Sequence, residues 1–171
     1  MMSAVLRRIA RLRVTIGFVA AVVALYLASP TARTLAAGAL VALVGEGMRV
    51  WAAGHLEKGR EVTTSGPYAL TRHPLYFGST LIGIGLAIAS ASVIVATLVT
   101  AYLAVTLTAA IRTEEAHLTE KFGGAYPAYR DGTGAGGRRR FSPARAMRNR
   151  EYRAVIGLAI ALAVLVWKTR G

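Results

Sequence analysis

Apolar residues run along the chain in long blocks, and short polar segments separate these blocks. The first block, residues 14–29, is short for a bilayer that needs roughly 20 apolar residues, but arginines flank it and can extend to the headgroups. Residues 35–54 are long enough for a second span, and residues 75–111 have the length of two spans with small residues at 89–92 as the turn. This pattern predicts an all-α, polytopic protein with about four to five membrane helices.

The remaining stretches complete one integral membrane domain over residues 1–171. After residue 130 we expect a basic, mobile segment at 131–153 and an apolar helix at 154–168. Because that last helix is shorter than a standard span, it either crosses the membrane or lies in its interface.

The second apolar block contains two ionisable residues, Glu46 and Arg49. Charges at this depth are costly, so they should pair or face a cavity. They lie three residues apart on one helical face, which leaves a local ion pair and the wall of a polar pocket as alternatives.

The chain has 54% hydrophobic residues and a formal net charge of +13. The two values fit together because Lys and Arg collect between the apolar blocks and near the ends, where they meet anionic lipid headgroups and set membrane orientation. We therefore expect membrane lipids as partners and no nucleic acid, with the N-terminus and the polar loops at the cytoplasmic face. The chain has no cysteine, which excludes disulfides and thiolate metal sites, and we expect no metal site.

The polar segment from Thr63 to Gly78 is the first with potential chemistry. Two prolines and a glycine fix its backbone, and Arg72 and His73 lie where the chain re-enters the bilayer. A helix entry with a snorkelling arginine explains this arrangement. The cluster of donors and tyrosine rings is also suited to an anionic, planar ligand.

The second such segment runs from Ile111 to Arg130. Glu114 shares a helical face with residues four and eight positions further on, so one acid can face inward. Glu115 either pairs with Arg112 on a surface helix or joins Glu114 in binding a cation at the membrane edge.

Together, GPYALTRHPLYFG and the later EEAHLTEKFGGAYPAYR closely resemble the isoprenylcysteine carboxyl methyltransferase and phospholipid methyltransferase superfamily, whose core reads GPY, RHPxYxG, EExxL and FGxxYxxY. The preceding MRVWAAGHL is similar to a helix of the same superfamily, and the resemblance covers residues 45–130, the core of the family. The resemblance implies a membrane methyltransferase that uses S-adenosyl-L-methionine, with a cofactor pocket at the cytoplasmic face. It assigns catalytic roles to Arg72 and Glu115, and it places cofactor-binding residues at Tyr68, His73, Tyr76, Gly78, Glu114, Glu115, Tyr126 and Tyr129.

The resemblance also implies an acceptor that is lipid-embedded or hydrophobic, such as a prenylated carboxylate or a lipid amine. Methyl transfer from a sulfonium needs alignment more than acid–base chemistry. A carboxylate needs no base, whereas an amine must lose a proton, for which Glu115 or water is a candidate. The acceptor and the oligomeric state stay open.

Two alternatives come from other functional classes. Sterol-type reductases share a related RHP-and-Tyr core and use a nicotinamide cofactor, but the adjacent acids Glu114 and Glu115 favour a cationic cofactor. A non-catalytic haem protein would use His55, His73 or His117, although an isolated loop histidine is more often a hydrogen-bonding residue. After Tyr129 the sequence departs from the superfamily pattern, so no role is carried over beyond that residue.

Overall fold

The computed structural model describes residues 4–133 and 137–170, and it describes side chains from residue 15 onward. The described residues form helices and no strand, which confirms the predicted all-α class. One short 3-10 helix, η1 (Gly66–Ala69), lies between α2 and α3. The α-helices in chain order are α1 (Ala4–Leu27), α2 (Ala32–His55), α3 (Pro74–Ser90), α4 (Val93–Phe122), α5 (Ala125–Arg130), α6 (Pro143–Arg148) and α7 (Tyr152–Lys168).

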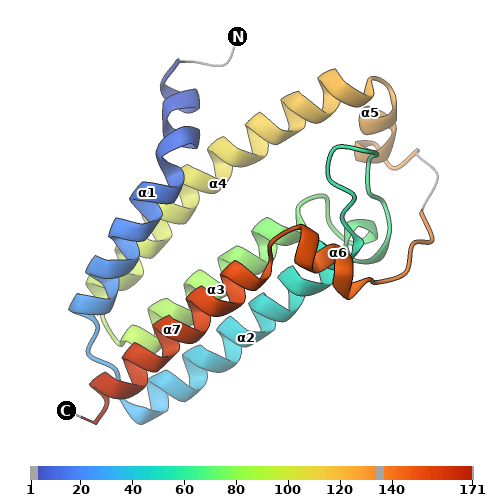
Figure 1. Cartoon of the computed structure of the whole chain (residues 1–171). Coiled ribbons are helices and arrows are strands. Elements are labelled where there is room, and N and C mark those ends of the chain that lie inside the picture. Colours follow the sequence, from blue (N-terminus) through green and yellow to red (C-terminus); the bar gives the residue numbers. More distant parts are fainter. Residues whose placement is uncertain (1–3, 134–136, 171) are drawn as a thin grey trace.

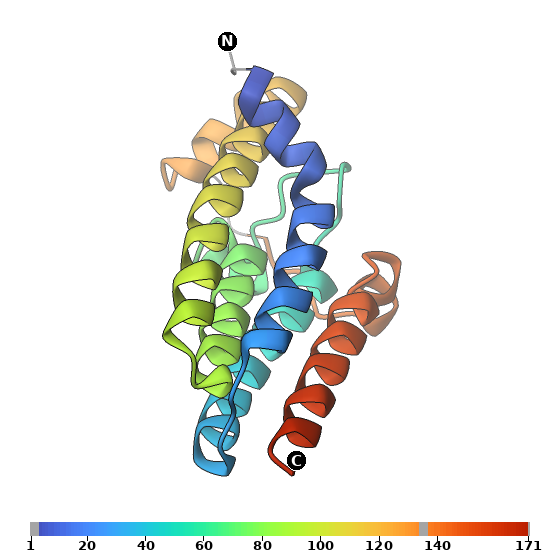
Figure 2. The same ribbon diagram turned by 90° about the vertical axis from the view of Figure 1, so that its left-hand side faces the viewer.

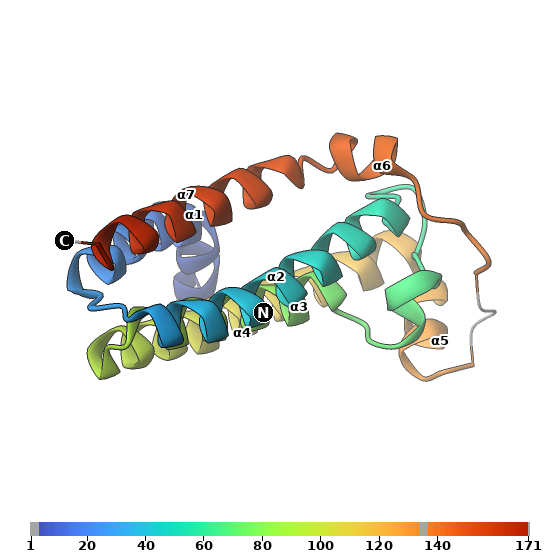
Figure 3. The ribbon, with the colours of Figure 1, turned by 90° about the horizontal axis from the view of Figure 1, so that it is seen from below.

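The long helices form a bundle of two layers. Helices α2, α3 and α4 make one layer, and α1 and α7 lie across it on the same face (Figure 3). The start of α1 and the end of α7 lie at opposite ends of the bundle (Figure 2). The short helices α5 and α6 and the connection between α2 and α3 gather at one end (Figure 1). That end carries the polar residues described below.

Glycines bring α2 and α3 into backbone contact. A β-carbon on Gly45 would lie 2.7 Å from the Gly78 carbonyl oxygen, and one on Gly85 would lie 2.5 Å from the Gly38 carbonyl oxygen. Neither distance is compatible with a side chain. Small residues at such positions let membrane helices approach closely enough for van der Waals contact along their length.

The α3–α4 hairpin confirms the predicted turn at residues 89–92. Pro74 begins α3, where its missing N–H costs no helical hydrogen bond. Ala91 ends the helix in the left-handed region with φ of 50°, and the Ser92 hydroxyl then accepts a hydrogen bond from the Val95 amide at 3.4 Å.

Helix α4 continues past the expected end of its span near Ile111. It is 30 residues long and ends at Phe122, before Gly123 with φ of +52°. The residues between 112 and 122 include neither proline nor glycine, so nothing interrupts the helix. At about 1.5 Å per residue, its last turns extend well beyond a hydrocarbon core of about 30 Å.

Two helices, α2 and α4, are long and apolar enough to cross a membrane. The apolar segments Thr15–Leu27 and Pro74–Ser90 are shorter. Large apolar side chains cover the outside of the bundle, among them Phe18, Val93 and Trp167, each at least 72% exposed. Such a surface suits lipid rather than water. The predicted total of four to five spans stays a prediction.

The C-terminal residues lie against the rest of the bundle. Helix α6 contacts the end of α2, and α7 follows α2 toward the opposite end (Figure 3). There the Lys168 ammonium donates hydrogen bonds to the carbonyls of Leu25, Tyr26 and Ala28 at the end of α1. The segment expected to be mobile thus has defined contacts over residues 137–153, and how far it moves stays a prediction.

Candidate active site

The site lies where the α2–α3 connection meets the end of α4 and α5. Gly66 has φ of +59°, and a β-carbon there would collide with the His55 ring. Only glycine allows this turn, which leads into η1 and buries Tyr68. The backbone therefore directs the residues before Pro74 toward α4.

A hydrogen bond joins the two segments that sequence analysis selected. The Nε2 atom of His73 lies 3.0 Å from Oε1 of Glu115, 42 residues further along the chain. The guanidinium of Arg72 lies 3.7 Å from the same oxygen. The predicted meeting of the RHP turn and the paired acids is confirmed. The alternative pairing of Glu115 with Arg112 is not formed.

A polar cavity of about 590 Å³ opens beside this contact. Its volume is within the range of cofactor pockets in proteins. The sequence-predicted residues that line it are Tyr68, Arg72, His73, Tyr76, Glu114, Tyr126 and Tyr129. Glu115 lies behind this wall and holds His73 and Arg72.

Glu114 is the acid that faces the cavity. Its carboxylate makes no hydrogen bond or ion pair with any other side chain in the described part of the chain, in contrast to Glu115. The two acids are one residue apart, about 100° around the helix. One acid is thus available to a ligand, while its neighbour supports the wall.

Tyrosines form the far side of the cavity. The Tyr129 hydroxyl donates a 2.6 Å hydrogen bond to the Tyr68 carbonyl, which ties α5 to η1. Tyr126 is 2% exposed, and its hydroxyl has no hydrogen-bond partner among the described residues. Burial, followed by the nearby Glu115 carboxylate, raises the pKa of Tyr126 to about 12. Its hydroxyl is therefore a neutral donor at physiological pH.

Gly78 has a different position from the other predicted site residues. It is absent from the cavity wall and packs against α2, where a β-carbon would lie 2.6 Å from both the Gly45 carbonyl oxygen and Cγ of Arg49. The space it leaves lets Arg49 pass over α3 into the cavity wall.

Arg49 takes up the second of its two predicted arrangements. It lines the cavity and does not bond to Glu46, whose buried carboxylate has no hydrogen-bond partner in the described part of the chain. Instead the Arg49 guanidinium bonds to Oε1 of Glu151 at 2.7 Å and to the Ser79 hydroxyl at 2.5 Å.

Sequence reasoning missed Glu151 and Asn149, which also line the cavity. Both residues belong to the segment beyond Tyr129, where the family pattern ends. The sequence offered one indication of Glu151. Arg49 is a charged residue within an apolar block and therefore needs a partner, but the sequence does not show which residue that partner is.

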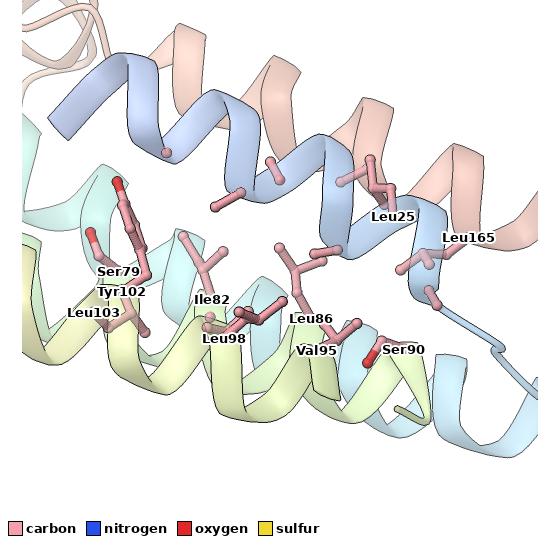
Figure 4. Close-up of a pocket in the computed structure, with 18 residues that line it drawn as sticks. Leu25, Ser79, Ile82, Leu86, Ser90, Val95, Leu98, Tyr102, Leu103 and Leu165 are labelled. Carbon is pink, nitrogen blue, oxygen red and sulfur yellow. The ribbon is translucent and has the colours of Figure 1, made fainter. Parts of the chain in front are cut away.

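The bundle also contains an apolar cavity of about 220 Å³, and Figure 4 shows the residues that line it. Residues of α1, α3, α4 and α7 line it, and nearly all of them are aliphatic. Ser79, Tyr102 and Leu103 line both cavities. The two spaces therefore lie next to each other inside the bundle, one suited to polar groups and the other to hydrocarbon.

Two of the three histidines proposed as haem ligands, His55 and His73, have other contacts. A ring nitrogen of His55 lies 3.0 Å from the Trp51 carbonyl oxygen, and His73 is engaged with Glu115. The described residues contain no group of three or more His, Asp or Glu side chains arranged to hold a metal ion.

A comparison with protein families finds that residues 12–125 match the phospholipid methyltransferase family. Comparisons with curated proteins and with solved structures find no match. The matched region includes the RHP turn and both acids, and it favours methyl transfer over the reductase and haem alternatives. The chain therefore belongs to the phospholipid methyltransferase family, within the superfamily of integral membrane methyltransferases that its motifs resemble.

Proposed function

We propose that the protein transfers a methyl group from S-adenosyl-L-methionine to a lipid-embedded acceptor in the polar cavity. The observation that carries this proposal is the contact of His73 with Glu115, which leaves Glu114 facing the cavity. A free carboxylate among tyrosine rings suits a ligand with an ammonium group and a sulfonium. S-Adenosyl-L-methionine carries both groups, together with a carboxylate that Arg72 can bind.

The chain's own residues hold and shield the reactants. Glu114 binds the cofactor's ammonium group, and Glu115 keeps His73 and Arg72 in the wall. Tyr68, Tyr76, Tyr126 and Tyr129 offer aromatic faces that exclude water. When bound, the cofactor supplies an electrophilic methyl group on a sulfonium sulfur. Alignment of that methyl with the acceptor in a dry site can supply much of the rate enhancement.

The apolar cavity supports a hydrophobic acceptor. Its aliphatic lining suits a hydrocarbon chain, because the chain stays out of contact with water there. An acceptor lying across Ser79 and Tyr102 would have its nucleophilic oxygen or nitrogen in the polar cavity. A carboxylate would attack directly, whereas an ammonium group would first lose a proton to water, because Glu115 lies behind the cavity wall and already pairs with His73.

The basic segments support a multi-pass orientation with the site on the cytoplasmic side. Lys and Arg are concentrated in the segments at the site end and in the first half of α1, which the positive-inside rule assigns to the cytoplasm. Both the soluble cofactor and a membrane lipid could reach the cavity from there.

The test is methyl transfer by protein reconstituted in lipid nanodiscs. Methyl-labelled S-adenosyl-L-methionine is supplied with phosphatidylethanolamine in one arm and with N-acetyl-S-farnesylcysteine in the other. The proposal expects label in the lipid extract of one arm, which identifies the acceptor as amine or carboxylate. If the protein is folded and neither acceptor becomes labelled, the proposed methyl transfer to a lipid amine or a prenylated carboxylate is wrong.

A further inference from the structure

The segment from Gly137 to Lys168 lies outside the region that matches the family, yet it contacts one face of α2 repeatedly. Its partners on α2 and just beyond are Arg49, Ala53, Leu56 and Glu57. Their spacing of four, seven and eight residues places them on one side of a helix. The segment is thus docked in a specific register.

The first contact is an ion-pair cluster around Glu57. Its Oε1 atom accepts hydrogen bonds from Arg145 at 2.7 Å and from Arg148 at 3.2 Å. Arg145 also donates to the Gly54 carbonyl at 2.6 Å, near the end of α2. The bond to Arg145 holds the pKa of Glu57 below its ordinary value.

The second contact satisfies carbonyl groups at the end of α2. The side-chain amide of Asn149 donates to the carbonyls of Ala53 at 2.8 Å and Leu56 at 2.9 Å. A helix C-terminus leaves such acceptors without intrahelical partners. Asn149 therefore replaces water at the point where α2 enters the polar cavity.

The third contact is the ion pair of Glu151 with Arg49. Glu151 is 6% exposed and precedes α7, and the Arg49 side chain that it binds is 21% exposed, so the pair is largely shielded from solvent. Removing one member of a buried pair leaves the other charge uncompensated. The pair fixes Arg49 where it can also donate to Ser79, a residue shared by both cavities.

From these contacts we propose that Glu151 is a positioning residue, which makes the C-terminal segment a part of the active site. Glu151 holds the Arg49 guanidinium at the junction of the polar and apolar cavities, where the acceptor's reactive group would lie. The position of the acceptor rests on the proposed function. The docking of the segment rests on the contacts alone.

The docking is tested without any ligand. Gly47 on α2 and Gly157 on α7 have open space around the position of a β-carbon, and the chain is free of cysteine, so cysteines at these two sites can carry spin labels. The distance distribution between the labels is expected to be narrow in the otherwise unchanged chain and broad in Glu151→Ala. Glu151→Gln should stay narrow, because its amide oxygen still accepts from Arg49. Arg153→Gln, an exposed change two residues away, is the matched control.

The positioning role is tested by exchanging the charges in Arg49→Glu/Glu151→Arg. The exchanged residues can form the ion pair again, so the distance distribution between the spin labels should be narrow. The rate of methyl transfer to the two acceptors above should stay at least about tenfold below wild type, because the cation at the junction is lost. Glu151→Gln should transfer methyl groups within about threefold of wild type.

Two results would overturn this inference. One is full turnover in the exchanged protein, which would make the pair structural only. The other is a narrow distribution in Glu151→Ala. A wild-type protein that is docked but methylates neither acceptor would overturn the proposed function instead.

Discussion

Glu114 and Glu115 are neighbours in the sequence but face different surroundings. Glu115 lies 3.0 Å from His73 and 3.7 Å from Arg72, so its charge is already compensated. Glu114 lines the cavity without such partners in the described residues. At the scale of single residues, the site thus separates an acid that supports the cavity wall from an acid that faces the cavity.

Replacing Glu115 tests its supporting role. In Glu115→Gln the amide oxygen can still accept from His73, so we expect affinity for S-adenosylhomocysteine to fall only a few-fold. Glu115→Ala removes the partner of both His73 and Arg72 and should weaken binding by about tenfold, the value of a hydrogen bond to a charged group. Calorimetric titration measures both. Glu120→Gln, an exposed acid on the same helix, should bind as wild type does.

The Tyr126 hydroxyl is buried without a partner, which ordinarily costs about 1–3 kcal/mol. We therefore expect Tyr126→Phe to melt at the same temperature as wild type or higher. If the hydroxyl donates to bound cofactor, the same variant binds S-adenosylhomocysteine more weakly. Higher stability with unchanged binding would assign Tyr126 to packing alone.

At the scale of elements, α2 and α3 depend on glycines that touch backbone to backbone. In Gly85→Ala the added methyl group would overlap the Gly38 carbonyl and the Ala42 amide, so we expect a loss of about 1–3 kcal/mol. Gly157→Ala adds the same group on α7, where nothing lies within 4 Å, and should be neutral or stabilising. Thermal unfolding in detergent compares the two variants. Equal melting temperatures would contradict the described contact.

The docking of α6 should depend on pH through Glu57. Because Arg145 lowers its pKa from 4.5, the folded state releases this proton more readily than the unfolded chain does. The ion pair's contribution is therefore complete above about pH 4.5 and disappears as the pH falls through the lowered folded value. Melting temperatures between about pH 6 and pH 3 should fall more steeply for wild type than for Glu57→Gln. Parallel curves would show that the pair adds no stability.

Local patterns predicted the elements better than they predicted their partners. The hairpin at residues 89–92 follows from small residues between two apolar runs, and the RHP turn follows from its prolines. The residues after Ile111 were expected to form a charged helix, and α4 continues through them to Phe122, because polarity changes there while helix propensity does not. The contacts of Arg49 with Glu151 and of Asn149 with α2 span more than 90 residues, which no local pattern encodes.

At the scale of the whole molecule, the start of α1 and the helix α5, which lines the polar cavity, lie toward one end of the bundle, and the end of α7 lies at the other (Figure 2). If all five long helices cross the membrane, Lys58 faces the cytoplasm while Arg33 and Thr169 face the opposite side. Single cysteines at these positions, in a chain that has none, can be labelled with a membrane-impermeant thiol reagent. When the reagent is added to intact cells, we expect it to label the cysteines at positions 33 and 169 and not the cysteine at position 58. Labelling of position 58 alone would show that the protein has the opposite orientation in the membrane.

The central claim is that His73 and Glu114 contribute to a single pocket for S-adenosyl-L-methionine. Binding of S-adenosylhomocysteine to the purified protein, followed by calorimetry, tests this most directly for wild type, Glu114→Gln and His73→Ala. We expect both substitutions to weaken binding by about tenfold or more, while Glu120→Gln leaves it unchanged. Equal affinity in all four proteins would contradict the account.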